Sequence, residues 1–238
     1  MLKNPLEIED RINLLSKCLF GGHRFNYPGV LVDEVIEDKN SEEICKAKAD
    51  YSDNVLFAMS SILGDKNRFD YSISPENIET MFDSIIILYK NYVSELTFMN
   101  NLNKKFKSDK GSLYLIVQNL ISNATHKFMD DKNSKVEISF SNFSGNIDDL
   151  AHTLVYTSPE TPTDGDFVKI NVKDNGHPFS KEYELVRYTE YGVKGGFRGK
   201  TGCGLYIVKM MCKMLRSHLA IDSKFRDVNV VVYHPLNL

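Results

Sequence analysis

The hydrophobic positions of this chain follow a helical pattern up to about residue 66 and a mixed pattern of helices and strands from residue 70 onward. In the stretch 6–38, apolar side chains recur at three-, four- and seven-residue steps, as one face of a helix requires, at Leu14, Cys18, Phe25, Val32 and Val35. Gly21, Gly22 and Pro28 interrupt the pattern, so it predicts a kinked helix or two helices. A further helix is expected over 44–63.

Together these stretches predict an N-terminal helical hairpin. One hairpin buries too little apolar surface to be stable alone. Pairing with a second copy would form a four-helix bundle and remove that deficit. We therefore expect residues 1–66 to form a dimerisation domain, with a homodimer as the assembly, and residues 67–238 to form a second domain.

The second domain alternates helical and strand patterns, and the expected fold class of the whole chain is α+β. Helices are predicted over 75–90, 112–129 and 202–217, and strands over 93–99, 136–143, 167–172 and 229–233. The segment 144–166 is rich in Ser, Thr, Pro, Gly and Asp, so it is interpreted as a long hairpin connection between two of these strands.

Composition bears on nucleic-acid binding, membrane insertion and the redox state of the cysteines. The chain of 238 residues carries 29 Lys and Arg against 32 Asp and Glu, so its net charge of −3 offers no bulk attraction to nucleic acid. Its longest apolar run, 85–88, is far too short to span a membrane. The 4 cysteines lack C-x-x-C spacing and no signal peptide precedes them, which favours reduced thiols and a cytoplasmic location.

Candidate chemistry begins with the segment Asn119-Leu-Ile-Ser-Asn123-Ala-Thr-His126-Lys127, which lies on a predicted helix. Asn119 and Asn123 are four residues apart, so their amides are expected to face the same way. An amide oxygen can bind Mg²⁺, a cation that takes oxygen ligands together with waters and substrate phosphates. His126 and Lys127 follow within one turn, where cations could contact phosphates.

Two further segments complete the candidate site. In Asp174-Asn-Gly176-His-Pro178-Phe, a carboxylate at the end of a strand can accept a hydrogen bond from an exocyclic amine such as that of adenine, and Gly176 lets a flat ring approach the backbone. The segment 192–205 holds six glycines before a helix, and a mobile basic lid over phosphates is expected there. Lys194, Arg198 and Lys200 are the expected phosphate contacts of this lid, and the candidate nucleotide-binding residues also include Gly202, Gly204 and Leu205.

These three segments, in this order, resemble the N box and the two glycine boxes of the GHKL ATPase superfamily, and within it the sensor histidine kinases. The resemblance implies a GHKL-type α/β sandwich over the second domain, with Mg-ATP bound between a sheet and a lid. It also implies that Asn123 is the Mg²⁺ ligand, that Asp174 reads adenine, and that Gly176, Gly202 and Gly204 allow backbone approach to the nucleotide. Pro178 stands where the family has a second glycine.

The resemblance also implies a phosphoacceptor in the hairpin. The first stretch contains a single histidine, His23, and Pro28 follows at the family's spacing. Neutral imidazole is a competent nucleophile near pH 7. Two positions depart from the common pattern, because Arg24 stands where an acid is usual and Tyr27 where Thr or Asn is usual.

The resulting hypothesis is a cytoplasmic histidine kinase core that binds Mg-ATP, phosphorylates His23 and passes the phosphate to an aspartate of a separate response-regulator receiver. Signal input would come from a separate sensor protein. Asn119 stands where the water-activating ATPases of the superfamily carry Glu, so phosphoryl transfer is favoured over hydrolysis or an ATP-gated clamp. One alternative is a degenerate kinase that acts as a histidine phosphotransfer or scaffold protein. Another is a serine kinase acting on a separate protein.

Overall fold

The computed structural model describes residues 46–47, 71–125, 133–150, 153–180, 184–193 and 203–236. Its helices are α4 (Pro75–Tyr89), α5 (Lys110–Thr125) and α6 (Gly204–Met214), with the 3-10 turns η3 (Ile147–Leu150) and η4 (Leu185–Thr189). Its strands are β1 (Tyr71–Ile73), β2 (Glu95–Asn101), β3 (Phe106–Ser108), β4 (Lys135–Asn146), β5 (Leu154–Tyr156), β6 (Asp164–Asp174), β7 (His218–Lys224) and β8 (Asp227–Pro235).

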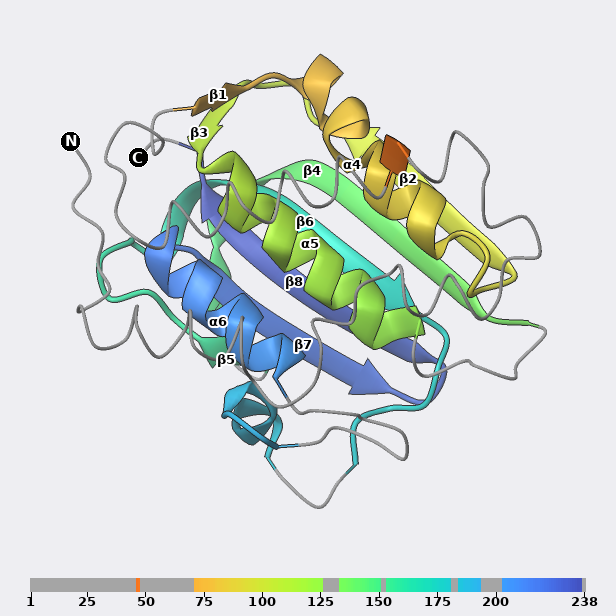
Figure 1. The fold of residues 1–238 in the computed structure, drawn as a ribbon. Helices are drawn as coiled ribbons and strands as arrows, with labels where there is room; N and C mark the ends of the chain where they lie inside the picture. Colours follow the sequence, from red (N-terminus) through yellow and green to blue (C-terminus); the bar gives the residue numbers. More distant parts are fainter. Residues whose placement is uncertain are drawn as a thin grey trace.

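The described elements form two layers (Figure 1). One layer is a 6-stranded sheet of order β2-β4-β6-β8-β7-β5, in which β2 pairs with β4 in parallel and the other pairs are antiparallel. The three helices α4, α5 and α6 cover one face of that sheet (Figure 1). The strands β1 and β3 pair separately as a 2-stranded sheet. This mixed α/β sandwich is the architecture that the second domain was expected to adopt.

Strand alternation explains how the main core forms between the layers. On β6, Val168, Ile170 and Val172 are all buried in the core beneath the helices, while the residues between them turn toward the other face. The helix α5 lies over the middle of the sheet, and 12 of its 16 residues are buried. Such a helix is covered on almost every side, which places its C-terminal end firmly against β6 and α6.

The connection between β4 and β6 is more ordered than the expected loop. After the two strands pair as far as Asn146 and Asp164, the chain forms η3 and then β5, which pairs with β7 at the opposite edge of the sheet. The connection therefore covers part of the sheet face away from the helices. A second, small core forms there around Ile147, Phe167 and Tyr233.

The helices and strands predicted from residue 75 onward are found among the described residues with shifted ends, and four further strands were not predicted. The first of the three helices ends one residue earlier than expected, at Tyr89, and β4 and β6 extend well beyond the predicted strands. The predicted helix 202–217 ends at Met214, and its last expected residue lies just before β7. The strands β1, β3, β5 and β7 were missed.

The predicted N-terminal hairpin lies outside the described residues, apart from two positions. Lys46 and Ala47 are helical, which agrees with the helix expected over 44–63. Ala47 is 2% exposed and belongs to the main core of the domain. Across the ranges that the structure describes, no helix combines the length and apolar character needed to cross a membrane.

A buried histidine joins three elements at one end of the sheet. The ring of His234 on β8 donates from Nε2 to the carbonyl oxygen of Lys107 on β3 at 2.9 Å. Because Nε2 carries the proton, Nδ1 accepts from the Ser217 hydroxyl, also at 2.9 Å. His234 is fully buried, and burial lowers its pKa to about 4 from the ordinary value of 6.5.

This depressed pKa predicts loss of stability in mild acid. Between pH 6.5 and about 4 the unfolded chain protonates this histidine while the folded chain does not. The free energy of unfolding should therefore fall by up to roughly 3 kcal/mol as the pH drops through that window, and then level off. Urea denaturation at pH 7, 5 and 4 measures this. In His234→Leu the fall should be smaller by that amount, and an unchanged pH profile in the variant would contradict the assignment.

Candidate nucleotide site

The two asparagines of α5 are held in different ways. The side-chain amide of Asn119 donates from Nδ2 to the carbonyl oxygen of Leu115 in the same helix at 2.8 Å. Asn123, one turn later, is half-buried, and its Nδ2 is buried with no hydrogen-bond partner among the described residues. The two amides were expected to face the same way, with Asn123 as the Mg²⁺ ligand. Asn123 is the one whose polar group is not committed within the helix.

The first residue of α6 lies directly against Asn123. A side chain at Gly204 would place its Cβ only 2.6 Å from Oδ1 of Asn123. The residue before the helix, Cys203, makes no side-chain cap hydrogen bond to it. The amide N–H groups of the first turn of α6 therefore lack a cap from this side chain and lie beside the Asn123 amide. Such a group of donors suits a phosphate, which is an anion rich in acceptors.

Asp174 is the last residue of β6 and lies in an apolar row of the sheet. It pairs with Val136 on β4 and with Val228 on β8, so the three side chains share one face. The two valines are fully buried, and Asp174 itself is 3% exposed. Its Oδ1 accepts a hydrogen bond from the backbone N–H of Gly176 at 2.9 Å. A buried carboxylate flanked by apolar walls is suited to read one polar group on a flat, apolar ring.

The loop after Asp174 is fastened on both sides by residues that sequence reasoning missed. Asn175 accepts from the Lys135 backbone N–H at 2.8 Å, which ties the loop to the start of β4. Further along, the backbone N–H of Phe179 donates to Oγ of Ser223 on β7 at 2.8 Å. Pro178 lies between these anchors, so the loop keeps a defined path although it lacks the family's second glycine.

The candidate groups lie at one end of the domain. Figure 1 shows the C-terminal end of α5 and the end of β6 at the same end of the sheet, and Asn123 contacts the start of α6. Leu205 was also expected to contact the nucleotide, but it is only 6% exposed and packs in the main core. The remaining predicted site residues lie outside the described residues; they are His23, His126, Lys127, Lys194, Arg198, Lys200 and Gly202.

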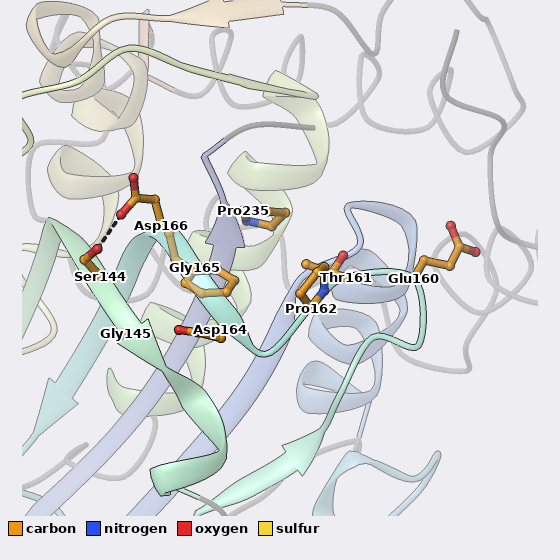
Figure 2. A pocket seen from close by; sticks show the side chains of 10 residues that line it. Ser144, Gly145, Glu160, Thr161, Pro162, Asp164, Gly165, Asp166 and Pro235 are labelled. Atoms are coloured by element: carbon orange, nitrogen blue, oxygen red, sulfur yellow. Dashed lines mark hydrogen bonds between the residues drawn. The ribbon is translucent and has the colours of Figure 1, made fainter.

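A separate pocket of about 580 Å³ lies at the other end of β6, where β4, β6 and β8 meet the connection (Figure 2). Two of its carboxylates are engaged by neighbouring side chains. Glu160 pairs with Arg216 at 2.7 Å, and Asp166 accepts a hydrogen bond from the Ser144 hydroxyl. The pocket takes in residues 164–167 of β6, so Asp174 lies roughly 23 Å along the strand from the nearest of them, at about 3.3 Å per residue. This pocket is therefore not part of the nucleotide site.

The donor set of the site fits a metal that arrives with its substrate. Within the described ranges, no cluster of three or more His, Cys, Asp or Glu could hold a metal ion. Asn123 offers a single amide, and its carboxamide has a buried nitrogen that no other group engages. Mg²⁺ keeps several waters and binds substrate phosphate oxygens, so it needs few protein ligands, and the Asn123 amide oxygen could serve as one of them.

Comparison with known proteins places the fold. No family model matches this chain, and no curated protein matches it. Among solved structures, it is similar to a mycobacterial sensor histidine kinase, MprB, with a TM-score of 0.50 and 12% identity over 70% of this chain and 97% of that one. It is also similar to full-length ShkA in complex with AMPPNP, with a TM-score of 0.52 and 17% identity over 97% of this chain and 46% of that one. The described domain has the fold of histidine kinase catalytic domains.

Proposed function

We propose that this chain is a protein-histidine kinase core that binds Mg-ATP and transfers the γ-phosphate to His23. The proposal rests on one observation: two unusual polar groups lie at the same end of a domain with the fold of histidine kinase catalytic domains. One is the Asn123 amide with its unpartnered nitrogen, and the other is the Asp174 carboxylate buried between valines. ShkA, whose structure is similar to this chain, was solved in complex with AMPPNP, which supports nucleotide binding by a chain of this fold.

Each residue has a stated part in the proposed site. Asp174 accepts a hydrogen bond from the adenine amine, while Gly176 leaves room for the ring beside the backbone. Asn123 would hold Mg²⁺, and the bound ion would neutralise charge on the β- and γ-phosphates. The part of the site that contacts the phosphates is completed by basic side chains and two further residues. The basic side chains are His126, Lys127, Lys194, Arg198 and Lys200, and the two others are Asn119 and Gly202. Catalysis on this account is mostly positioning and charge neutralisation.

The transfer step uses the hairpin as its acceptor. A ring nitrogen of His23 attacks the γ-phosphorus, the bond from phosphorus to the β–γ bridging oxygen breaks, and ADP leaves with that electron pair. The phosphate then passes to an aspartate on a separate receiver domain. Residues 1–66 form the dimeric hairpin on this proposal, and residues 67–238 form the catalytic domain. The catalytic chain is cytoplasmic and receives its signal from a separate sensor protein.

Labelling tests the acceptor. Incubation with γ-labelled ATP should give an acid-labile, base-stable adduct, as expected of phosphohistidine. His23→Gln should lose nearly all of the label, whereas the matched substitution His152→Gln, in the connection, should keep it. Both variants are compared at equal occupancy by ATP. Full labelling of the His23 variant would refute the assignment of His23.

A second function is favoured by specific residues of the hairpin. Arg24 and Tyr27 replace the acid and the Thr or Asn usual beside the acceptor, as expected if the protein only relays phosphate. Such a degenerate kinase would accept phosphate from a receiver and would not need ATP. Calorimetric titration separates the two, because saturable Mg-dependent ATP binding favours the kinase and its absence favours the relay or scaffold.

A further inference from the structure

The start of α6 is shaped by a side chain of another helix. A Cβ placed on Gly204 would lie 2.6 Å from Oδ1, 2.9 Å from Nδ2 and 3.1 Å from Cγ of Asn123. The two shorter distances are closer than carbon atoms approach such groups in folded proteins. The carboxamide of Asn123 therefore occupies the space that any side chain at residue 204 would need. Glycine at this position makes room for a neighbouring residue of the same protein.

Packing on Gly204 is what orients this carboxamide. Asn119 has the same side chain one turn earlier, and its amide is held by a 2.8 Å hydrogen bond to the Leu115 carbonyl oxygen. Asn123 has no such bond from its nitrogen, which is buried. Its orientation must then come from the surfaces against it, and one of these is the bare backbone of Gly204, whose missing side chain leaves the space that the carboxamide fills.

The backbone of Gly204 is itself well fixed. It begins α6, whose residues Leu205, Val208 and Met211 are buried in the main core. The Ile207 N–H also bonds the Cys203 carbonyl at 2.9 Å, so the first turn is formed on both sides of Gly204. A methyl group added there would displace the short Asn123 side chain more readily than it would move the helix.

We infer that Gly204 is a positioning residue, which sets the Asn123 carboxamide in the direction needed to bind Mg²⁺ with the nucleotide. The inference rests on the proposed function, since it concerns the same site. It gives Gly204 a part beyond backbone approach to the phosphates. An alanine at this position should turn the amide away from the metal and leave the adenine contacts of Asp174 intact.

The experiment compares the wild-type chain with Gly204→Ala, Asn123→Ala and the double variant. The affinity for ATP is measured by calorimetry with excess Mg²⁺ and with EDTA. Gly204→Ala should weaken Mg-ATP binding about 10- to 100-fold, the usual effect of losing a group that orients a metal ligand. It should leave metal-free ATP binding unchanged. When Asn123 is already alanine, the second substitution should have little further effect.

Thermal unfolding supplies a readout that needs no nucleotide. A purely local effect of the added methyl group would shift the melting temperature equally in the wild-type and Asn123→Ala backgrounds. Displacement of the Asn123 carboxamide predicts that the two shifts differ, with the less favourable shift in the wild-type background. Unchanged Mg-ATP affinity in Gly204→Ala would overturn the inference while leaving the proposed function standing. If the wild-type chain binds no Mg-ATP, the proposed function fails and the inference fails with it.

Discussion

Asp174→Asn should weaken ATP binding by about 100-fold while the domain stays folded. The asparagine oxygen can still accept the Gly176 N–H bond that Asp174 accepts at 2.9 Å. Its nitrogen, however, is a donor and would face the amine donor of adenine in a buried apolar row. Losing a charge-assisted hydrogen bond and leaving donors unpaired costs roughly 2–3 kcal/mol, which corresponds to about this factor in the dissociation constant.

Base discrimination gives this prediction a second readout. The wild-type carboxylate should disfavour GTP, because guanine presents a carbonyl oxygen where adenine presents its amine. Asp174→Asn should therefore reduce the preference for ATP over GTP as well as the affinity for ATP. Asp222→Asn is the matched control, since that carboxylate lies on β7 and pairs with Lys224 at 2.9 Å. Equal ATP affinity in the wild type and Asp174→Asn would remove Asp174 from the site.

The second large effect is expected at Asn123. Asn123→Ala should weaken Mg-ATP binding roughly 10- to 100-fold, because it removes the one described side chain proposed to hold the metal. Removing Mg²⁺ with EDTA should weaken ATP binding by the wild-type chain by a similar factor. In Asn123→Ala the same removal should change little, since the ion and the amide act through one contact.

Phosphorylation provides an independent check on this variant. Labelling of His23 from γ-labelled ATP should fall at least as far as the affinity, because transfer also requires charge neutralisation on the γ-phosphate. Ser122→Ala, at the preceding residue of α5, controls for general damage to the helix. A chain whose Mg²⁺ dependence survives Asn123→Ala would need a different metal ligand.

The helices of the described domain could be predicted from sequence because their apolar faces are long. The strand β4 could be predicted in the same way, because apolar residues alternate along it at Val136, Ile138 and Phe140, and all three are buried. The strand β7 escaped prediction for a physical reason. Its first four residues are all buried, since the helices cover one face and the connection covers the other, so the alternation typical of a half-exposed strand is absent.

Short strands were missed because their partners are distant in sequence. The strand β5 has only 3 residues and pairs with β7, so nothing local marks it. The segment 144–166 was interpreted as a long connection because it is rich in Ser, Thr, Pro, Gly and Asp, which include Gly145 and Gly165. In the structure they form a cross-strand pair with positive φ angles of 146° and 155°. Their conformation extends the hairpin where a loop was expected.

In the candidate site, too, features marked by local sequence could be predicted, and features that depend on distant residues could not. The motif around Asn123 and the Asp174 loop could be recognised because their spacing along the chain carries the chemistry. The anchors Asn175 and Ser223 could not, since their parts depend on which strand ends lie beside the loop. The contact between Asn123 and Gly204 joins residues far apart in sequence, and only the packing of α5 against α6 reveals it.

The most direct measurement is a calorimetric titration of the wild-type chain with ATP in the presence of Mg²⁺. The account predicts saturable binding at one site per chain, with an affinity that falls when EDTA removes the metal and falls again in Asp174→Asn. A folded chain that shows no saturable binding of ATP would contradict it. So would binding that is indifferent to Mg²⁺, to Asn123 and to Asp174.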